Sequence, residues 1–449
     1  MVIRNRSFRV TMMWLAQGYE PSYRTINRFR IHPQMQELLR QCFVQFRCQL
    51  VEEQLIDQKA IFIDGTKIEA NANKFTFVWK KSIEKHHANL IEKSNQLYDQ
   101  LLEEQVIPAI ERENTEQLSV KELGQVVSAL EEVVDDYNTK IEASNDPIER
   151  KRLRSKRKTP KQILKQVNDW MIRKQKYKKD LDIMGTRNSY SKTDHDATFM
   201  RMKDDYMQNG QLKAGYNLQI ATENQFTLAY DIFPNPTDTK TMTPFLDTIE
   251  ESYFELPEHI VADAGYGSEA NYEDVMMKRE RTPLITYGMY RKEQQKKYKQ
   301  DPFKTSNWAY DEDSDTYTCP NERNLAFQYH ATRKDPSGFV RQFKVYECDD
   351  CSGCPLRHLC TKAEEGTNRK LNVNLKWEQQ KAYVQQKLSE EETAAIYRQR
   401  KIDVEPVFGF LKANLGFTRF SVRGTSKVKN EIGLALMATN LRKYTLRGV

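Results

Sequence analysis

Three acidic residues stand where a chain could use them for chemistry. Asp64 ends the apolar run 60–63 and Asp263 ends the run 259–262, and a glycine follows each within two residues. This pattern predicts two buried strands, each presenting a carboxylate at a reachable end. Glu405 lies much later, in a stretch with helical periodicity. Such carboxylates can hold two divalent cations, one activating an attacking oxygen and one stabilising a leaving oxygen, as in a hydrolase or nucleotidyl transferase.

The stretch around Glu405 predicts an amphipathic helix. Glu405 and Lys412 are seven residues apart and share one face, while Val404, Val407 and Leu411 can face a core. Basic side chains precede the glutamate and could contact nucleic-acid phosphates. They are Arg398, Arg400 and Lys401. An ordinary charged surface helix is the alternative.

Proline complicates this helix. Pro406 follows Glu405 directly and predicts that a helix begins or bends there, because proline lacks the backbone N–H of an interior turn. An earlier helix is predicted to open with a capping box at Ser389 and Glu392.

Five of the seven cysteines lie close together late in the chain. They are Cys319, Cys348, Cys351, Cys354 and Cys360. Without a secretion signal, this spacing predicts a structural zinc ion held by four of the five rather than disulfides. An iron–sulfur cluster or free thiols are the alternatives. Cys42 and Cys48 lie on an apolar helical pattern and are expected in a core.

The composition predicts a multidomain cytoplasmic protein. A chain of 449 residues suggests two to four domains, and its 30% of charged residues suggests solvated helical arms. Residues 1–4 do not begin a signal peptide, and no apolar run approaches the roughly 20 residues of a membrane span.

The net charge of +7 is concentrated in residues 149–180, which contain fourteen Lys or Arg and three acids. A patch of this kind typically meets a polyanion such as DNA, although a solvated helix is the alternative. The candidate DNA contacts in it are Arg152, Arg154, Lys156, Arg157 and Lys158.

Helical patterns occupy two further regions. In residues 1–58, an apolar run at 8–16, a turn and an N-cap at Ser22 indicate either a helix-turn-helix that docks DNA through Arg24 and Arg28 or a plain helical packing unit. Periodic apolar residues over 83–101 and 120–141 predict an antiparallel helical hairpin. A third helix is predicted to start at Thr159 and Pro160.

Taken together, these motifs resemble the DDE transposases of bacterial insertion sequences, most closely the insertion sequence 1182 group. The stretches that carry the resemblance are residues 63–66, 261–267 and 404–412, with 191–197, 215–217 and the Cys-rich part in support. The resemblance implies an α/β fold: a ribonuclease H-like catalytic core of mixed sheet and helices, interrupted by a helical-hairpin insertion and a Cys-rich insertion and preceded by an all-α N-terminal domain. The expected parts are 1–58 (N-terminal helices), 59–80 (core), 81–185 (helical insertion), 186–300 (core), 301–388 (Cys-rich insertion) and 389–449 (core helices with the glutamate).

The resemblance also implies a chemistry. Asp64, Asp263 and Glu405 would bind two Mg2+ or Mn2+ ions, water would cleave double-stranded DNA at the element's ends, and the freed 3′-hydroxyl would attack target DNA. A homodimer is expected because two ends need two sites. A nuclease that cuts without joining and a DNA-binding relic without catalysis are the alternatives.

Two departures from the family pattern matter. The family signature places a tyrosine and a basic residue before the glutamate and a lysine after it. Tyr397 and Lys412 match, but the spacing leaves either Arg400 or Lys401 as the basic partner. Related chains also have more sequence before the part matching residues 1–33, which predicts a shortened DNA-recognition region here.

Overall fold

The computed structural model describes residues 14, 17, 19–202 and 210–447. The chain divides into two compact units, one formed by residues up to Ile68 and from Tyr216 onward, the other by Glu69–Gly215. The first unit carries all three candidate acids. Within the described residues, no helix is long and apolar enough to cross a membrane.

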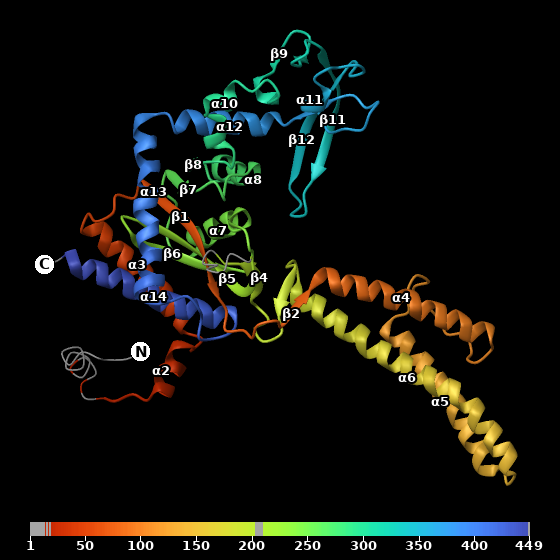
Figure 1. Cartoon of the computed structure of the whole chain (residues 1–449). Helices are drawn as coiled ribbons and strands as arrows, with labels where there is room; N and C mark the ends of the chain where they lie inside the picture. The colour runs from red at the N-terminus through yellow and green to blue at the C-terminus, as the bar shows by residue number, and fades with distance from the viewer. Residues whose placement is uncertain (1–13, 15–16, 18, 203–209, 448–449) are drawn as a thin grey trace. The chain divides into compact units, whose positions relative to one another are not determined.

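A mixed sheet forms the centre of the first unit (Figure 1). Its strands are β1 (Ala60–Glu69), β5 (Leu212–Glu223), β6 (Phe226–Phe233), β7 (His259–Ala262) and β8 (Thr282–Ile285), in the order β6-β5-β1-β7-β8. β5 and β6 form an antiparallel pair, and β1, β7 and β8 are parallel. Helices separate the later strands, so the arrangement is compatible with a ribonuclease H-like core.

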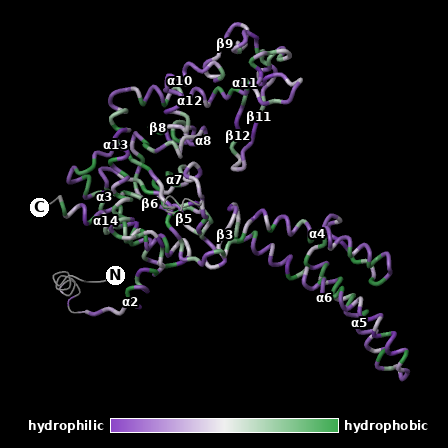
Figure 2. Tube along the Cα trace, in the orientation of Figure 1, coloured by the Kyte–Doolittle hydropathy of each residue, from purple (hydrophilic) through white to green (hydrophobic). Residues whose placement is uncertain are grey.

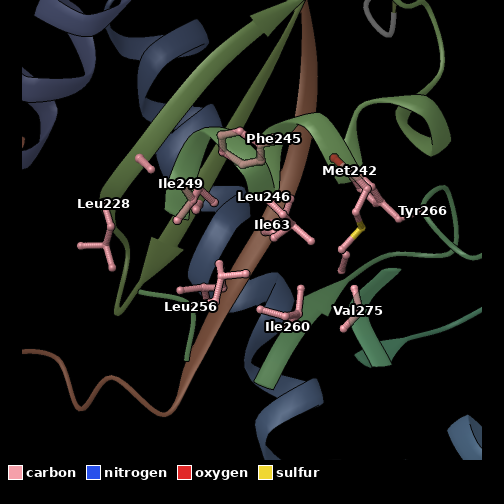
Figure 3. Close-up of a cluster of buried hydrophobic side chains, with 14 of the residues drawn as sticks. Ile63, Leu228, Met242, Phe245, Leu246, Ile249, Leu256, Ile260, Tyr266 and Val275 are labelled. Carbon is pink, nitrogen blue, oxygen red and sulfur yellow. The ribbon is translucent and has the colours of Figure 1, made fainter. Parts of the chain in front are cut away.

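Helix α7 (Met242–Ser252) covers one face of this sheet. Its Phe245, Leu246 and Ile249 are fully buried and pack with Ile63 of β1 and Ile260 of β7 (Figure 3). Burial of each such side chain contributes about 1.5–3 kcal/mol. Because side chains alternate along a strand, Asp64 points away from the face on which Ile63 packs.

The N-terminal helices of this unit are α2 (Tyr23–Arg30) and α3 (Met35–Glu52). The predicted N-cap is confirmed, since Ser22 Oγ accepts a hydrogen bond from the Thr25 N–H at 3.2 Å. The apolar run 8–16 lies almost wholly outside the described residues. The prediction that Cys42 and Cys48 are core residues was wrong, because both are exposed. The buried face of α3 is formed instead by Met35, Leu39, Phe43, Phe46 and Leu50.

The C-terminal helices are α12 (Leu375–Lys387), α13 (Glu391–Gly409), the π-helical turn η4 (Phe410–Asn414) and α14 (Thr425–Arg447). The prediction that a helix begins at Pro406 was wrong, because α13 continues through it, whereas the predicted bend stays a prediction. Pro406 removes only one helical hydrogen bond, at Ile402, whose 67% exposure lets water reach this side of the helix. The predicted capping box was also wrong, since α13 begins after Glu390 and Ser389 Oγ donates to the Gln386 carbonyl.

The Cys-rich part forms a separate antiparallel sheet in the first unit. Its order is β13-β12-β11-β10-β9, and Trp308, Leu325, Tyr346 and Leu371 form its small core. The strands are β9 (Ala309–Asp311), β10 (Thr316–Thr318), β11 (Asn324–Lys334), β12 (Val340–Cys348) and β13 (Lys370–Val373). The short helix α11 (Arg357–Cys360) lies between β12 and β13. The remaining short elements are η1 (Asp238–Lys240), α8 (Glu269–Glu273), η2 (Asp274–Lys278), α9 (Tyr290–Glu293), α10 (Lys296–Lys299) and η3 (Thr305–Asn307).

The second unit is dominated by α4 (Lys80–Glu103), α5 (Val120–Ala143) and α6 (Pro147–Met184). Hydrophobic and hydrophilic residues alternate along these helices (Figure 2). This is expected where each helix buries one apolar face and exposes the opposite polar face. α5 and α6 pair closely across a three-residue loop. The predicted helix start at Pro160 was wrong: Asp146 caps α6 and Pro147 occupies its first turn, so the helix already exists when Pro160 enters it.

Three short strands complete the second unit. β2 (Phe77–Trp79) pairs antiparallel with β3 (Ser189–Ser191), and β4 (Thr198–Arg201) pairs antiparallel with the first residues of β5, Leu212 to Gly215.

Candidate active site

The parallel pairing of β1 and β7 brings the two aspartates together. Ile63 pairs with Ala262, so Asp64 of β1 and Asp263, directly after β7, are the next residues of two paired strands. Neighbouring strands lie about 4.8 Å apart, which places the two aspartates side by side. Each carboxylate accepts a hydrogen bond from a following glycine. Asp64 Oδ1 accepts from the Gly65 N–H at 2.7 Å, and Asp263 Oδ1 accepts from the Gly265 N–H at 2.8 Å. These bonds fix both carboxylates on rigid backbone.

A third aspartate, which the sequence did not single out, lies beside this pair. Asp238 begins the short helix η1. A Cβ atom at Gly65 would lie 2.8 Å from Asp238 Oδ1, and one at Gly265 would lie 2.9 Å from Asp263 Oδ1 and 3.8 Å from Asp238 Oδ2. The carboxylates of Asp238 and Asp263 therefore flank the same glycine. A side chain at Gly65 would collide with Gln219, only 2.2 Å away, so this position needs glycine.

Buried amides hold Asp238 in place. The Asn217 and Gln219 side chains donate to Asp238 Oδ1 at 2.8 and 3.1 Å. Tyr266, which is fully buried, donates to Gln219 Oε1 at 2.5 Å. Burial, and after it the charges of Asp238, Asp64 and Asp263, raises the pKa of Tyr266 well above its ordinary value. The Tyr266 phenol is therefore neutral, and its hydroxyl holds the Gln219 side chain that in turn donates to Asp238.

One sequence signal could have found this network. Asn217 and Gln219 alternate on β5, a strand that is otherwise apolar in this part, and both side chains are completely buried. Buried amides need partners, so two of them at positions i and i+2 indicate a polar group on the facing element.

Helix α13 presents a cation to the first aspartate. Arg400 Nη1 lies 3.8 Å from Asp64 Oδ2, with both side chains largely buried. One turn earlier, the Tyr397 hydroxyl hydrogen-bonds Thr286 Oγ1 at 3.0 Å, just beyond β8. Lys401 is exposed. The structure thus places Arg400, and not Lys401, beside Asp64.

The structure does not bring Glu405 to the aspartates. Glu405 is exposed, and it lies five residues after Arg400, which is about 140° around the helix. Asp403 instead turns inward and accepts from the Thr222 hydroxyl at 2.6 Å. Lys412 is half-buried in η4. The role predicted for Glu405 therefore stays a prediction.

The donor chemistry at the aspartates fits a hard divalent cation. The carboxylates of Asp64, Asp263 and Asp238 and the amides of Asn217 and Gln219 offer oxygen atoms, which Mg2+ prefers over nitrogen or sulfur. Across the described part of the chain, no three His, Cys, Asp or Glu side chains form a group that could hold a metal ion. Mg2+ commonly uses only one or two protein carboxylates and completes its shell with substrate phosphates and water, so Asp64 and Asp263 suffice on the protein side.

The five late cysteines converge in the Cys-rich sheet. They line one cavity of about 20 Å3, together with Arg323, Arg357 and Arg369. Cys351 Sγ accepts from the Arg369 N–H at 3.3 Å, and Cys348 Sγ donates to the Asp350 carbonyl at 3.6 Å. Burial, and then the neighbouring Cys351, raises the pKa of Cys348 to about 12.

The predicted DNA-contacting residues outside α13 and η4 lie on α2 and α6. In the first unit, Arg24 and Arg28 are exposed on α2, whereas the nearby Arg30 is bound to Glu431 at 3.2 Å. In the second unit, Arg157 donates to Asn138 of α5. The other four predicted residues of the basic patch are exposed on α6, namely Arg152, Arg154, Lys156 and Lys158.

Comparison with known proteins adds a family. Residues 318–445 match the family described as Transposase DDE domain. The matched part contains Glu405 and the five late cysteines but neither Asp64 nor Asp263. The match supports a DDE transposase family and an enzyme of the nuclease or transferase kind acting on DNA.

A stretch of 75 residues is 44% identical to the Type II restriction enzyme CeqI of Rhodococcus hoagii, which amounts to 17% of this chain and 24% of that protein. The chain thus spans about a quarter of the length of this curated relative. No solved structure matches the chain.

Proposed function

We propose that the protein is a DNA transposase of a bacterial insertion sequence, of the insertion sequence 1182 group, that cleaves and joins DNA at Asp64 and Asp263. The observation that carries the proposal is the parallel register of β1 and β7, which sets these two aspartates side by side in a chain whose C-terminal part matches a DDE transposase domain. Asp238 flanks the same glycine as Asp263 and is the third carboxylate of the proposed site.

The reaction is two in-line displacements at phosphorus. In cleavage, a water oxygen bonds to phosphorus and the bond to the 3′-oxygen breaks, leaving a 3′-hydroxyl and a 5′-phosphate. In joining, that 3′-hydroxyl oxygen bonds to a target phosphorus and displaces the target's own 3′-oxygen. Bound Mg2+ or Mn2+ ions, two in the proposal, would supply Lewis acidity for both steps. Asp64 and Asp263 would hold them, with Glu405 as the further ligand implied by the family resemblance.

The chain's own residues position the DNA and balance charge. The hydrogen bonds from Gly65 and Gly265 hold Asp64 and Asp263 in place for the scissile phosphate. Arg400 and Lys412 approach the DNA backbone next to the site, and Tyr397 orients this part of α13 through Thr286. The basic patch on α6 and Arg24 and Arg28 on α2 bind double-stranded DNA away from the site. A homodimer would supply one active site for each element end.

A structural zinc ion in the Cys-rich sheet belongs to the same proposal. Its support is the Cys-x-x-Cys-x-x-Cys spacing together with the convergence of all five thiols on one small cavity. Four thiolates would close a tetrahedral shell and leave no open position, so the ion would stabilise this sheet, which has only a small apolar core, and take no part in the reaction.

A nuclease that cuts without joining is the second candidate. It is favoured by the stretch that is 44% identical to a protein named as a restriction enzyme. The test incubates the purified protein and Mg2+ with end-labelled DNA carrying the element's termini and with a supercoiled target plasmid. Transposase activity predicts both 3′-end cleavage and labelled plasmid. Cleavage without labelled plasmid would support the nuclease, and activity that survives Asp263→Asn would exclude this site altogether.

A further inference from the structure

An aromatic pocket in the second unit has no part in the chemistry above. It has a volume of about 220 Å3 and is lined by four aromatic side chains, Phe75, Phe77, Trp79 and Phe199. Small alanines leave the space open between these rings. They are Ala70, Ala72 and Ala214. Because pockets for drug-sized ligands start at about 300 Å3, this one has the size for a smaller planar group.

Strand pairing builds the aromatic wall. Phe77 and Trp79 are two residues apart on β2 and point to the same side, with ring centroids 5.7 Å apart. Phe199 of β4 completes the wall, standing edge-on to Phe77 at 5.3 Å and tilted against Trp79 at 6.0 Å. The Phe199 N–H donates to Ser189 Oγ on β3, the strand that pairs with β2. Three rings are therefore held in fixed positions.

The loop before β2 carries the fourth ring in an unusual backbone conformation. Phe75 has a φ of +61° and is 75% exposed. A bulky residue is rarely found at positive φ, because its Cβ clashes there and the conformation costs about 1–3 kcal/mol. Hydrogen bonds hold the loop, with Thr193 Oγ1 accepting from the Asn73 N–H and the Thr76 carbonyl accepting from the Lys192 N–H. Packing does not explain the strain, since the ring faces solvent.

Apart from Leu212, the remaining lining residues are polar, and two of them are lysines that can attract an anion. Lys74 is exposed, and Lys213 Nζ lies 3.1 Å from Glu69 Oε2, which also belongs to the pocket lining. Asn73 and Gln211 add side-chain amides, which can both donate and accept hydrogen bonds. An apolar side chain of a protein partner would desolvate these groups without compensating them. A nucleobase offers a flat apolar face, a hydrogen-bonding edge and a phosphate beside it.

We infer that this pocket binds an unpaired base of DNA, stacked between Phe75 and the wall formed by Phe77, Trp79 and Phe199, with the neighbouring phosphate at Lys74. Stacking of a base on an aromatic side chain is worth about 1–3 kcal/mol and tolerates any sequence, so the pocket would recognise an extruded or single-stranded base by its exposed face. The inference rests on the proposed function only in taking DNA as the ligand.

The experiment uses the full chain without added divalent cation and a DNA duplex with one bulged 2-aminopurine, compared with the same duplex in which that base is paired. The native protein should quench the fluorescence of the bulged base and bind the bulged duplex about tenfold more tightly than the paired one. Phe75→Leu should abolish that tenfold preference, and Phe75→Tyr, which keeps the ring, should retain it. Tyr329→Leu, which changes an exposed aromatic residue of the first unit, is the matched control.

Three results would overturn the inference. They are equal binding of both duplexes by the native protein, an equal effect of Phe75→Leu on both, and loss of self-association in Phe75→Leu, which would identify a second copy as the occupant. Quenching of the bulged base by a protein that cleaves no DNA in the element-end assay described above would leave the inference intact and contradict the proposed function instead. Cleavage with no preference for the bulged duplex would do the reverse.

Discussion

Arg400 lies 3.8 Å from Asp64, so the first aspartate of the proposed site already faces a cation supplied by the chain itself. Removing that charge should leave the aspartates more repulsive toward one another and more attractive to Mg2+. We expect Arg400→Gln to lower the half-saturating Mg2+ concentration for DNA cleavage about fivefold, while weakening binding of DNA. A Mg2+ titration of the cleavage rate measures this effect. Lys401→Gln, at the exposed neighbouring position, should change neither the Mg2+ requirement nor the position of Asp64.

Asp238 should matter to the reaction although no sequence motif marks it. Asp238→Asn keeps the side-chain shape and an acceptor for Asn217 but removes the negative charge. We expect cleavage to fall about 10- to 100-fold with little change in melting temperature. Glu251→Gln, an exposed acid on α7, is the control. Full activity of Asp238→Asn would show that Asp64 and Asp263 work without it.

Glu405 offers a sharper test, because its position here is away from the aspartates. If α13 turns Glu405 toward bound DNA and metal, Glu405→Gln should lower cleavage at least about 100-fold and leave the free protein as stable as before. Glu391→Gln, at the exposed start of the same helix, should leave the rate of DNA cleavage unchanged. A fully active Glu405→Gln protein would mean that the three aspartates form the complete acidic set.

The cysteine cluster can be tested by metal content. We expect the purified chain to carry about one zinc ion, and each of four Cys→Ser changes among the five late cysteines to release it. The fifth variant should keep its zinc and so identify the spare thiol. Cys42→Ser, at an exposed position of α3 outside the cluster, should retain the metal. A metal-free native protein that folds normally would contradict the zinc proposal.

A buried glutamate should make stability depend on pH. Burial is the main reason that the pKa of Glu223 is raised to about 7 from the model-peptide value of 4.5. The folded state holds the proton of Glu223 more tightly than the unfolded state. This proton's contribution to the free energy of unfolding is therefore fully present below pH 4.5 and is lost as the pH rises through about 7. Glu223→Gln keeps an acceptor for the N–H groups of Asp57 and Gln58.

Melting temperatures measured from pH 4.5 to 8.5 test that expectation. The melting temperature of Glu223→Gln should fall less than that of the native chain as the pH rises. The difference between the two melting temperatures should be largest above pH 7. Glu392→Gln, which lines the same surface cavity, should follow the native curve. Parallel curves for native protein and Glu223→Gln would contradict the assignment.

Sequence patterns predicted the structure correctly where it depends only on residues close together in the chain. Apolar runs predicted β1 and β7, and Ser22 was recognised as a cap because its side chain needs only the N–H three residues later. Local rules failed where a neighbour decided the outcome. Pro160 and Pro406 read as helix boundaries, yet both lie inside helices that were already nucleated and packed upstream. The exposure of Cys42 likewise depends on which stripe of α3 meets the sheet.

The sequence by itself determined that Asp64 and Asp263 end apolar strands, because strand patterning and the glycines that follow are written in consecutive residues. Only the tertiary structure decided that these strands are neighbours, that Asp238 joins them, and that Arg400 rather than Lys401 reaches Asp64. Those outcomes depend on the order of strands and on the rotation of α13, which are set by contacts between residues far apart in the chain. For the same reason, the face on which Glu405 lies could not be read from its spacing alone.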